Sequence, residues 1–64
     1  MIRLNGVERE GAGLTVESLL ESMGVETRGI AVAVDGEIVR RSRWADTIVA
    51  DDSNVEIVTA AAGG

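Results

Sequence analysis

Two dipeptides constrain the fold of this chain more than any other feature of its sequence. Asn5-Gly6 and Asp35-Gly36 each follow a run with the two-residue period of a β-strand. Such dipeptides favour the two-residue turn of a β-hairpin, because both central residues of that turn need a positive φ angle. The sequence therefore predicts two antiparallel hairpins, one built from residues 1–5 and 7–10 and the other from residues 30–34 and 37–40.

A short amphipathic helix is predicted between the two hairpins. Thr15 suits the N-cap position, and Gly24 suits the left-handed residue that ends a helix. A helix of about two turns cannot bury its apolar stripe alone, so we expect it to pack on a sheet. The apolar residues of that stripe follow helical spacing: Val16, Leu19, Leu20 and Met23.

The order of elements predicts an α+β fold. A turn over residues 51–54 precedes a last strand over residues 55–59. One helix packed across one face of a mixed four- to five-stranded sheet, with the last strand parallel to the first, satisfies this order. That arrangement is the β-grasp, or ubiquitin-like, fold. We expect residues 1–59 to form the β-grasp domain and residues 60–64 to form a flexible C-terminal tail.

Composition narrows the chemistry available to the chain. Its 64 residues include 6 arginines and 11 acidic residues, a formal net charge of −5, and neither Cys, His nor Lys. Without Cys or His, the commonest nucleophiles, general bases and metal ligands are missing, so we expect no enzyme activity, no metal site and no bound cofactor. The acidic balance argues against nucleic acid, and no apolar run suits a membrane or a signal peptide, so we expect a cytoplasmic protein.

The end of the chain offers the one group suited to covalent chemistry. Residues 60–64 carry no large side chain, and the chain stops at Gly63-Gly64. A segment without bulky side chains can thread a narrow channel, which points to the Gly64 carboxylate as the reactive group, with Gly63 and Ala62 threading into a partner. The plainer alternative is that many chains end in small residues without any function.

Three further groups of residues have both a functional and a structural interpretation. Trp44, the one aromatic residue, is interpreted as a core or edge plug rather than as a binding hot spot. The basic cluster over residues 40–43 is interpreted as a solvated strand end rather than as a contact for a nucleotide or an acidic partner. Asp51 and Asp52 are interpreted as turn-forming residues rather than as cation ligands.

The chain resembles the ThiS family, the sulfur carriers of thiamine biosynthesis, from its first residue to its last. Two positions depart from the usual family pattern: Arg40 stands where the family usually has Pro, and Asp52-Ser53-Asn54 replaces the usual turn. Neither position lies at the reactive end. The resemblance is carried by Asn5-Gly6, Thr15-Val16, Leu19-Leu20, residues 31–39, Arg41-Ser42, Trp44, residues 55–58 and Gly63-Gly64.

The resemblance implies a mechanism and a set of partners. An E1-like adenylating enzyme of the ThiF type would use ATP and Mg²⁺ to adenylate the Gly64 carboxylate. A persulfide donor would then convert the adenylate into a thiocarboxylate, and a thiazole synthase of the ThiG type would take the sulfur. In ubiquitin-like proteins the corresponding sheet face docks an enzyme, so the resemblance favours the face around Ala31 and Ala33 as a docking face. Both alanines could equally occupy a plain solvent face.

Other interpretations remain open from the sequence. The nearest is another Gly-Gly carrier, especially the small subunit of molybdopterin synthase, or a covalent protein modifier like ubiquitin. The other is a non-covalent ubiquitin-like interaction module, for which the chain end would be irrelevant. The acceptor and the partner would distinguish these functions.

Overall fold

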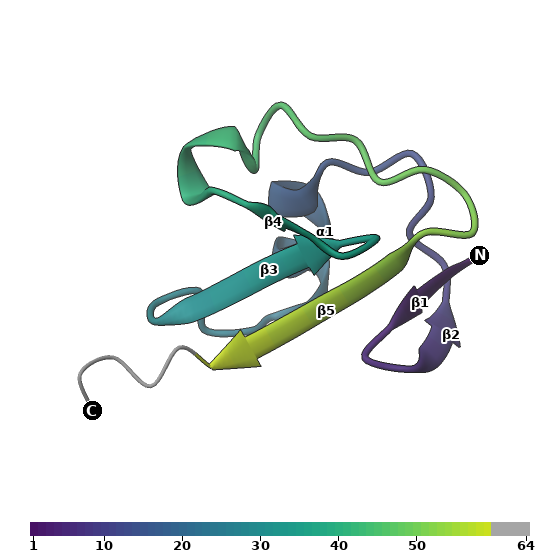
Figure 1. Cartoon of the computed structure of the whole chain (residues 1–64), viewed down its shortest axis with the longest axis horizontal. Coiled ribbons are helices and arrows are strands. Elements are labelled where there is room, and N and C mark those ends of the chain that lie inside the picture. Colours follow the sequence, from purple (N-terminus) through teal and green to yellow (C-terminus); the bar gives the residue numbers. More distant parts are fainter. Residues whose placement is uncertain (60–64) are drawn as a thin grey trace.

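The computed structural model describes residues 1–59, which form one five-stranded sheet and one α-helix (Figure 1). The predicted tail, with Ala62, Gly63 and Gly64, lies outside the described residues. In chain order the elements are β1 (Ile2–Leu4), β2 (Val7–Arg9), α1 (Val16–Met23), β3 (Ile30–Val34), β4 (Glu37–Val39), a 3-10 helix (Arg41–Arg43) and β5 (Asn54–Thr59).

The sheet has the strand order β2-β1-β5-β3-β4. β5 lies between β1 and β3, parallel to β1 and antiparallel to β3, and the other pairs are antiparallel. The helix packs behind the sheet on one face only (Figure 1). The predicted α+β, β-grasp architecture is thus confirmed with five strands, although three strands are one or two residues shorter than expected.

Both predicted hairpin turns are present. Asn5 and Gly6 have φ angles of 50° and 85°, and Asp35 and Gly36 have φ angles of 51° and 88°. Two consecutive positive φ angles give a turn whose twist matches that of the flanking strands, and Asn, Asp and Gly adopt such angles at least cost. The turns therefore set the register of both hairpins.

The helix begins and ends at the predicted residues. The Thr15 hydroxyl accepts a hydrogen bond of 3.0 Å from the Ser18 backbone N–H. Gly24 ends the helix at a φ of 67°, and its N–H donates to the Glu21 carbonyl over 3.1 Å. These two caps satisfy backbone groups that would otherwise lack partners at the helix ends.

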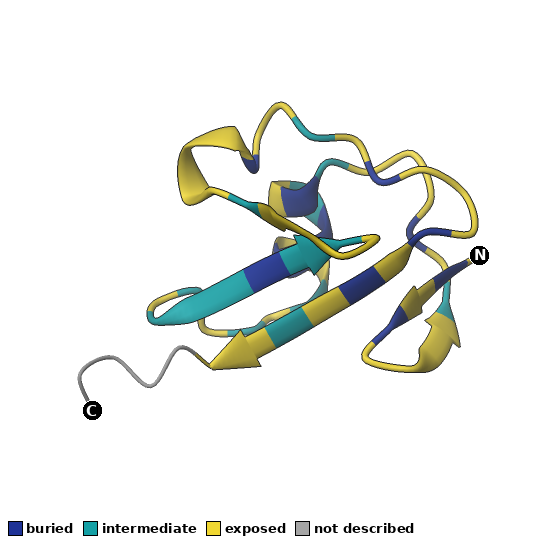
Figure 2. Cartoon of the chain, in the orientation of Figure 1, coloured by how far each residue is buried: buried dark blue, intermediate teal, exposed yellow. Residues whose placement is uncertain are grey.

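The core lies between the helix and the inner face of the sheet (Figure 2). Two of its members come from the irregular segment between β4 and β5, namely Trp44 and Val49. Val49 exchanges two 2.8 Å backbone hydrogen bonds with the segment that precedes α1, donating to Leu14 and accepting from Gly13. The irregular segment is therefore fixed to the helix start. The other core residues are Ile2, Leu4, Val16, Leu19, Leu20, Val32 and Val55.

Within residues 1–59, the structure contains no helix of the length and apolarity needed to cross a membrane.

Candidate docking face

The last strand, β5, lies in the middle of the sheet and leads to the C-terminal residues of the chain. Thr59, the last described residue, lies opposite Ile30 at the start of β3. Strands β1 and β3 hold β5 from both sides. The predicted reactive residues Ala62, Gly63 and Gly64 follow it outside the described residues, so their roles stay predictions.

Ala31 and Ala33 lie on the sheet face that points away from the helix. They alternate with Val32, which is fully buried on the opposite face, and both alanines are half-buried. The strand register places Val58 directly opposite Ala31 and Ile38 directly opposite Ala33. The two predicted residues thus lie together on one surface with two larger apolar residues beside them.

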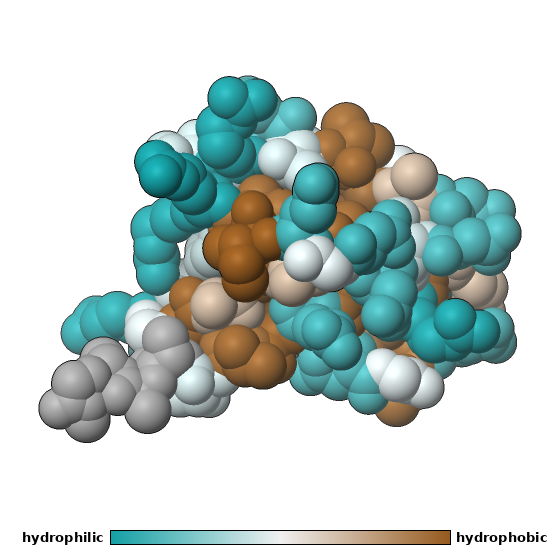
Figure 3. Space-filling view, in the orientation of Figure 1, coloured by the Kyte–Doolittle hydropathy of each residue, from teal (hydrophilic) through white to brown (hydrophobic). Residues whose placement is uncertain are grey.

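These larger neighbours add exposed apolar surface to the outer face, beside the exposed Glu56 that lies opposite Ala33 on β5. The side chains of Ile38 and Val58 are 68% and 57% exposed. Figure 3 shows apolar side chains gathered at the middle of this face. We call the four residues Ala31, Ala33, Ile38 and Val58 the outer patch. The sequence analysis missed Ile38 and Val58, because only the register between strands shows that they flank the alanines.

Trp44 is a structural residue, as predicted. Its side chain is 5% exposed, and the indole Nε1–H donates to the Val39 carbonyl over 2.9 Å. The Arg41 guanidinium lies over the indole ring, 4.8 Å from its centroid, and donates to the Thr27 carbonyl. Arg41 is exposed, as predicted for a solvated strand end, and it differs from Arg40 and Arg43 in that it also packs against Trp44 and residue 27.

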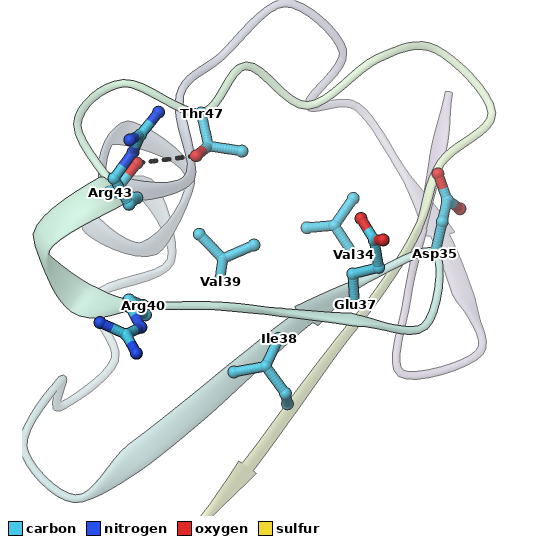
Figure 4. Close-up of a pocket in the computed structure, with 8 residues that line it drawn as sticks. All are labelled: Val34, Asp35, Glu37, Ile38, Val39, Arg40, Arg43 and Thr47. Atoms are coloured by element: carbon cyan, nitrogen blue, oxygen red, sulfur yellow. Dashed lines mark hydrogen bonds between the residues drawn. The ribbon is translucent and has the colours of Figure 1, made fainter.

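The two other arginines of the cluster border a hollow beside β4. Arg40 and Arg43 are exposed, as predicted for a solvated strand end. Figure 4 shows them at one end of a hollow of about 460 Å³ that lies between β4 and residues 43–47. The Thr47 hydroxyl donates to the Arg43 carbonyl over 2.7 Å and fixes the far wall.

The acidic pair before β5 forms a turn, as predicted. Asp52 has a φ of 66°, and its N–H donates to the Met1 carbonyl over 2.8 Å. Asp51 also accepts a hydrogen bond of 2.5 Å from the Met1 amino group, which the sequence analysis did not foresee. This hydrogen bond raises the pKa of the amine and lowers the pKa of the Asp51 carboxyl. Among residues 1–59, no three potential metal ligands are grouped.

Comparison with known proteins identifies the family. Residues 2–64 match the ThiS family. The chain belongs to the ThiS family. It is 38% identical to the sulfur carrier protein ThiS of Thermus thermophilus over 64 residues, which cover 100% of both chains. It is 40% identical to the sulfur carrier protein ThiS of Escherichia coli over 53 residues, 83% of this chain and 80% of that one.

A solved ThiS structure and a longer protein are also similar. The crystal structure of the thiamine biosynthesis protein ThiS from Geobacter metallireducens matches with a TM-score of 0.77 and 30% identity, covering 89% of this chain and 88% of that one. A thiazole synthase of Paramagnetospirillum magneticum is 44% identical over 62 residues. The match covers 95% of this chain but only 19% of the length of the synthase.

Proposed function

We propose that this ThiS-family chain is a sulfur carrier of thiamine biosynthesis that holds its sulfur as a thiocarboxylate on Gly64. The carrier role follows from membership of the family. The observation that supports the Gly64 assignment is that the family match reaches residue 64 and so includes the Gly63-Gly64 end. The chain supplies neither a Cys nor a His, so its own carboxylate is the group offered to an activating partner.

The proposed activation has two covalent steps. An E1-like adenylating enzyme joins the Gly64 carboxylate to the α-phosphate of Mg²⁺-bound ATP, releasing pyrophosphate and forming an acyl-adenylate. The terminal sulfur of a persulfide attacks the acyl carbon and displaces AMP, and a thiol then cleaves the acyl disulfide to leave the thiocarboxylate. The small side chain of Ala62 and the bare backbone of Gly63 let this end enter a narrow active site. Catalysis belongs to the partners, and the chain acts as their substrate.

The outer patch is the proposed docking surface for the adenylating enzyme. Exposed apolar side chains gain most from burial in an interface, and Ile38 and Val58 are the two most exposed members of the patch. Val58 lies one residue before the end of β5. An enzyme bound to the patch would therefore sit beside the point where the chain continues toward Gly64.

A thiazole synthase is the proposed acceptor of the sulfur. The match to the Paramagnetospirillum magneticum protein supports this assignment, since a segment resembling this chain occurs there within a longer protein named thiazole synthase. Because the activating step uses ATP, we place the reaction in the cytoplasm.

Intact mass measurement tests the proposal. The purified chain is incubated with an E1-like adenylating enzyme, ATP, Mg²⁺ and a persulfide source. We expect the mass gain of one oxygen replaced by sulfur, located on the C-terminal peptide. A variant with one residue added after Gly64 is the matched control, because it keeps the fold but moves the carboxylate, and it should gain nothing. Equal sulfur incorporation in this control, or sulfur on another peptide, would refute the Gly64 assignment.

A further inference from the structure

β4 leaves one of its two edges without a strand partner. It lies at the end of the sheet and pairs only with β3. The Asp35-Gly36 turn places Val34 opposite Glu37, so these two residues exchange the hydrogen bonds that close a two-residue hairpin. Hydrogen-bonded pairs alternate along an antiparallel ladder, so the backbone N–H and C=O of Ile38 point away from β3. The free edge thus presents one donor and one acceptor.

The hollow shown in Figure 4 runs along this free edge. Val34 and Val39 point into the hollow and give it an apolar floor, and Ile38 also lines it, with its side chain directed toward the outer face. Arg43 and Thr47 line its opposite side. Neighbouring strands lie about 4.8 Å apart, so a strand added to β4 would run through this hollow.

The two ends of the hollow carry opposite charges. Asp35 and Glu37 lie at one end, and Arg40 and Arg43 lie at the other (Figure 4). Within residues 1–59, the ion pair that forms is between Met1 and Asp51, so neither arginine has a carboxylate at ion-pair distance. Both ends therefore keep their charge available to a ligand.

We infer that the hollow binds an extended segment of a partner protein, which adds to the free edge of β4 as a further strand. The segment exchanges hydrogen bonds with the Ile38 backbone and places an apolar side chain against Val34 and Val39. An acidic side chain meets Arg40 and Arg43, and a basic side chain meets Asp35 and Glu37. Arg40 follows Glu37 by three residues and Asp35 by five, so in a ligand strand that runs alongside them the two charges lie about four residues apart.

A second copy of this chain fits the hollow less well than a lone segment. Pairing β4 with β4 of another copy would bring both copies of residues 40–47 onto the same edge. Those residues already wall the hollow on its far side. A single extended segment has no such flanking wall of its own, so it fits between β4 and residues 43–47. The site meets the outer patch at Ile38, which lines the hollow and also belongs to the patch, but it does not involve the chemistry at Gly64.

Titration with a designed peptide tests this inference in solution. The probe is acetyl-Ser-Glu-Val-Val-Val-Lys-Ser-amide, added to the isotopically labelled full chain and followed by amide resonances. We expect shifts in residues 37–40 and 43–47 and slower hydrogen exchange at the Ile38 amide. Two further probes carry an N-methyl group on the central Val or on its neighbour. Alternate N–H groups face the partner strand, so at least one of these should bind about tenfold more weakly.

Charge variants distinguish peptide binding in this hollow from non-specific electrostatic attraction between the peptide and the protein. Arg40→Glu combined with Arg43→Glu should weaken peptide binding about tenfold, while Arg28→Glu, an exposed arginine outside the hollow, should leave it unchanged. Ile38→Pro removes the outward N–H together with the Ile38 side chain and should weaken binding more than Ile38→Ala, which keeps the N–H. The inference is wrong if millimolar peptide gives no shifts, if both N-methyl probes bind unchanged, or if shifts centre on Ala31 and Val58. None of these outcomes bears on the Gly64 proposal.

Discussion

The helix-facing and outer faces of the sheet come from the same strands but differ in burial. On β3, Val32 is fully buried under the helix, whereas its neighbours Ala31 and Ala33 are half-buried on the other side. On the outer side the larger side chains of Ile38 and Val58 remain mostly exposed. The difference shows how a domain of this size divides its apolar residues, because strand alternation buries one set in the core and leaves the other set on the surface.

The largest expected effect comes from the helix-facing side. Leu19→Ala should lower the free energy of unfolding by about 2–5 kcal/mol, because Leu19 is fully buried and the substitution leaves a cavity. Ile38→Ala is the matched outer-face control and should change stability by less than about 1 kcal/mol. Urea denaturation of both variants provides the measurement. Equal losses in the two variants would break the distinction between the faces.

The next effect concerns partner binding on the outer face. Ile38→Thr combined with Val58→Thr keeps β-branched residues in both strands but removes apolar contact area. We expect about tenfold weaker binding to an E1-like adenylating enzyme, with stability nearly unchanged. Calorimetric titration and a thermal melt measure the two quantities. Unchanged affinity would remove the outer patch from the docking surface.

A smaller effect on stability is expected at Trp44, whose side chain packs in the core and hydrogen-bonds to β4. Trp44→Phe keeps an aromatic ring under Arg41 but leaves the Val39 carbonyl without the indole donor. The expected loss of stability is about 1–2 kcal/mol. Thr47→Val is a suitable control, because it removes the more exposed hydrogen bond to the Arg43 carbonyl and should cost less. A larger loss for Thr47→Val than for Trp44→Phe in urea denaturation would contradict this order.

The smallest effect is expected at the exposed ion pair between Met1 and Asp51. The raised pKa of the amine contributes stability below pH 8.0, the ordinary pKa of this group, and this contribution is lost as the pH rises through the higher folded pKa. The lowered pKa of the Asp51 carboxyl contributes stability above pH 3.8, and this contribution is lost as the pH falls through the lower folded pKa.

Asp51→Asn should therefore reduce the melting temperature slightly between these limits and flatten its dependence on pH. Thermal melts from about pH 3 to about pH 10 measure this dependence. Asp46→Asn, another exposed aspartate, serves as the control and should keep the wild-type profile. If the two variants have the same profile, the ion pair does not contribute to stability in solution.

Local signals were sufficient to predict most elements of the fold. Asn5-Gly6 and Asp35-Gly36 have the positive φ angles that their residue types favour, and Thr15 and Gly24 cap the helix as expected. Each of these features depends on the conformation of one or two residues and their immediate neighbours. The parallel pairing of β1 with β5 followed from the order of the elements and the constraints on their connections.

Features that depend on contacts between distant segments were missed. Val49 has no periodic neighbours, and it joins the core because its backbone bonds with Gly13 and Leu14 hold the irregular segment in place. The outer patch was predicted only as its alanines, since the register that adds Ile38 and Val58 depends on two strand pairings. Arg41 is exposed like Arg40 and Arg43, but its contact with the ring of Trp44 could not be predicted from the sequence.

The central position of β5 also affects how this protein is made. Leu4 lies opposite Val55, so the first strand must wait for the last before the middle of the sheet can form. The ribosome must therefore release the residues of β5 before the domain can fold. A product cut short before β5 lacks the central strand and exposes apolar side chains that proteases and chaperones recognise. Folding thus selects for copies whose synthesis has passed residue 59.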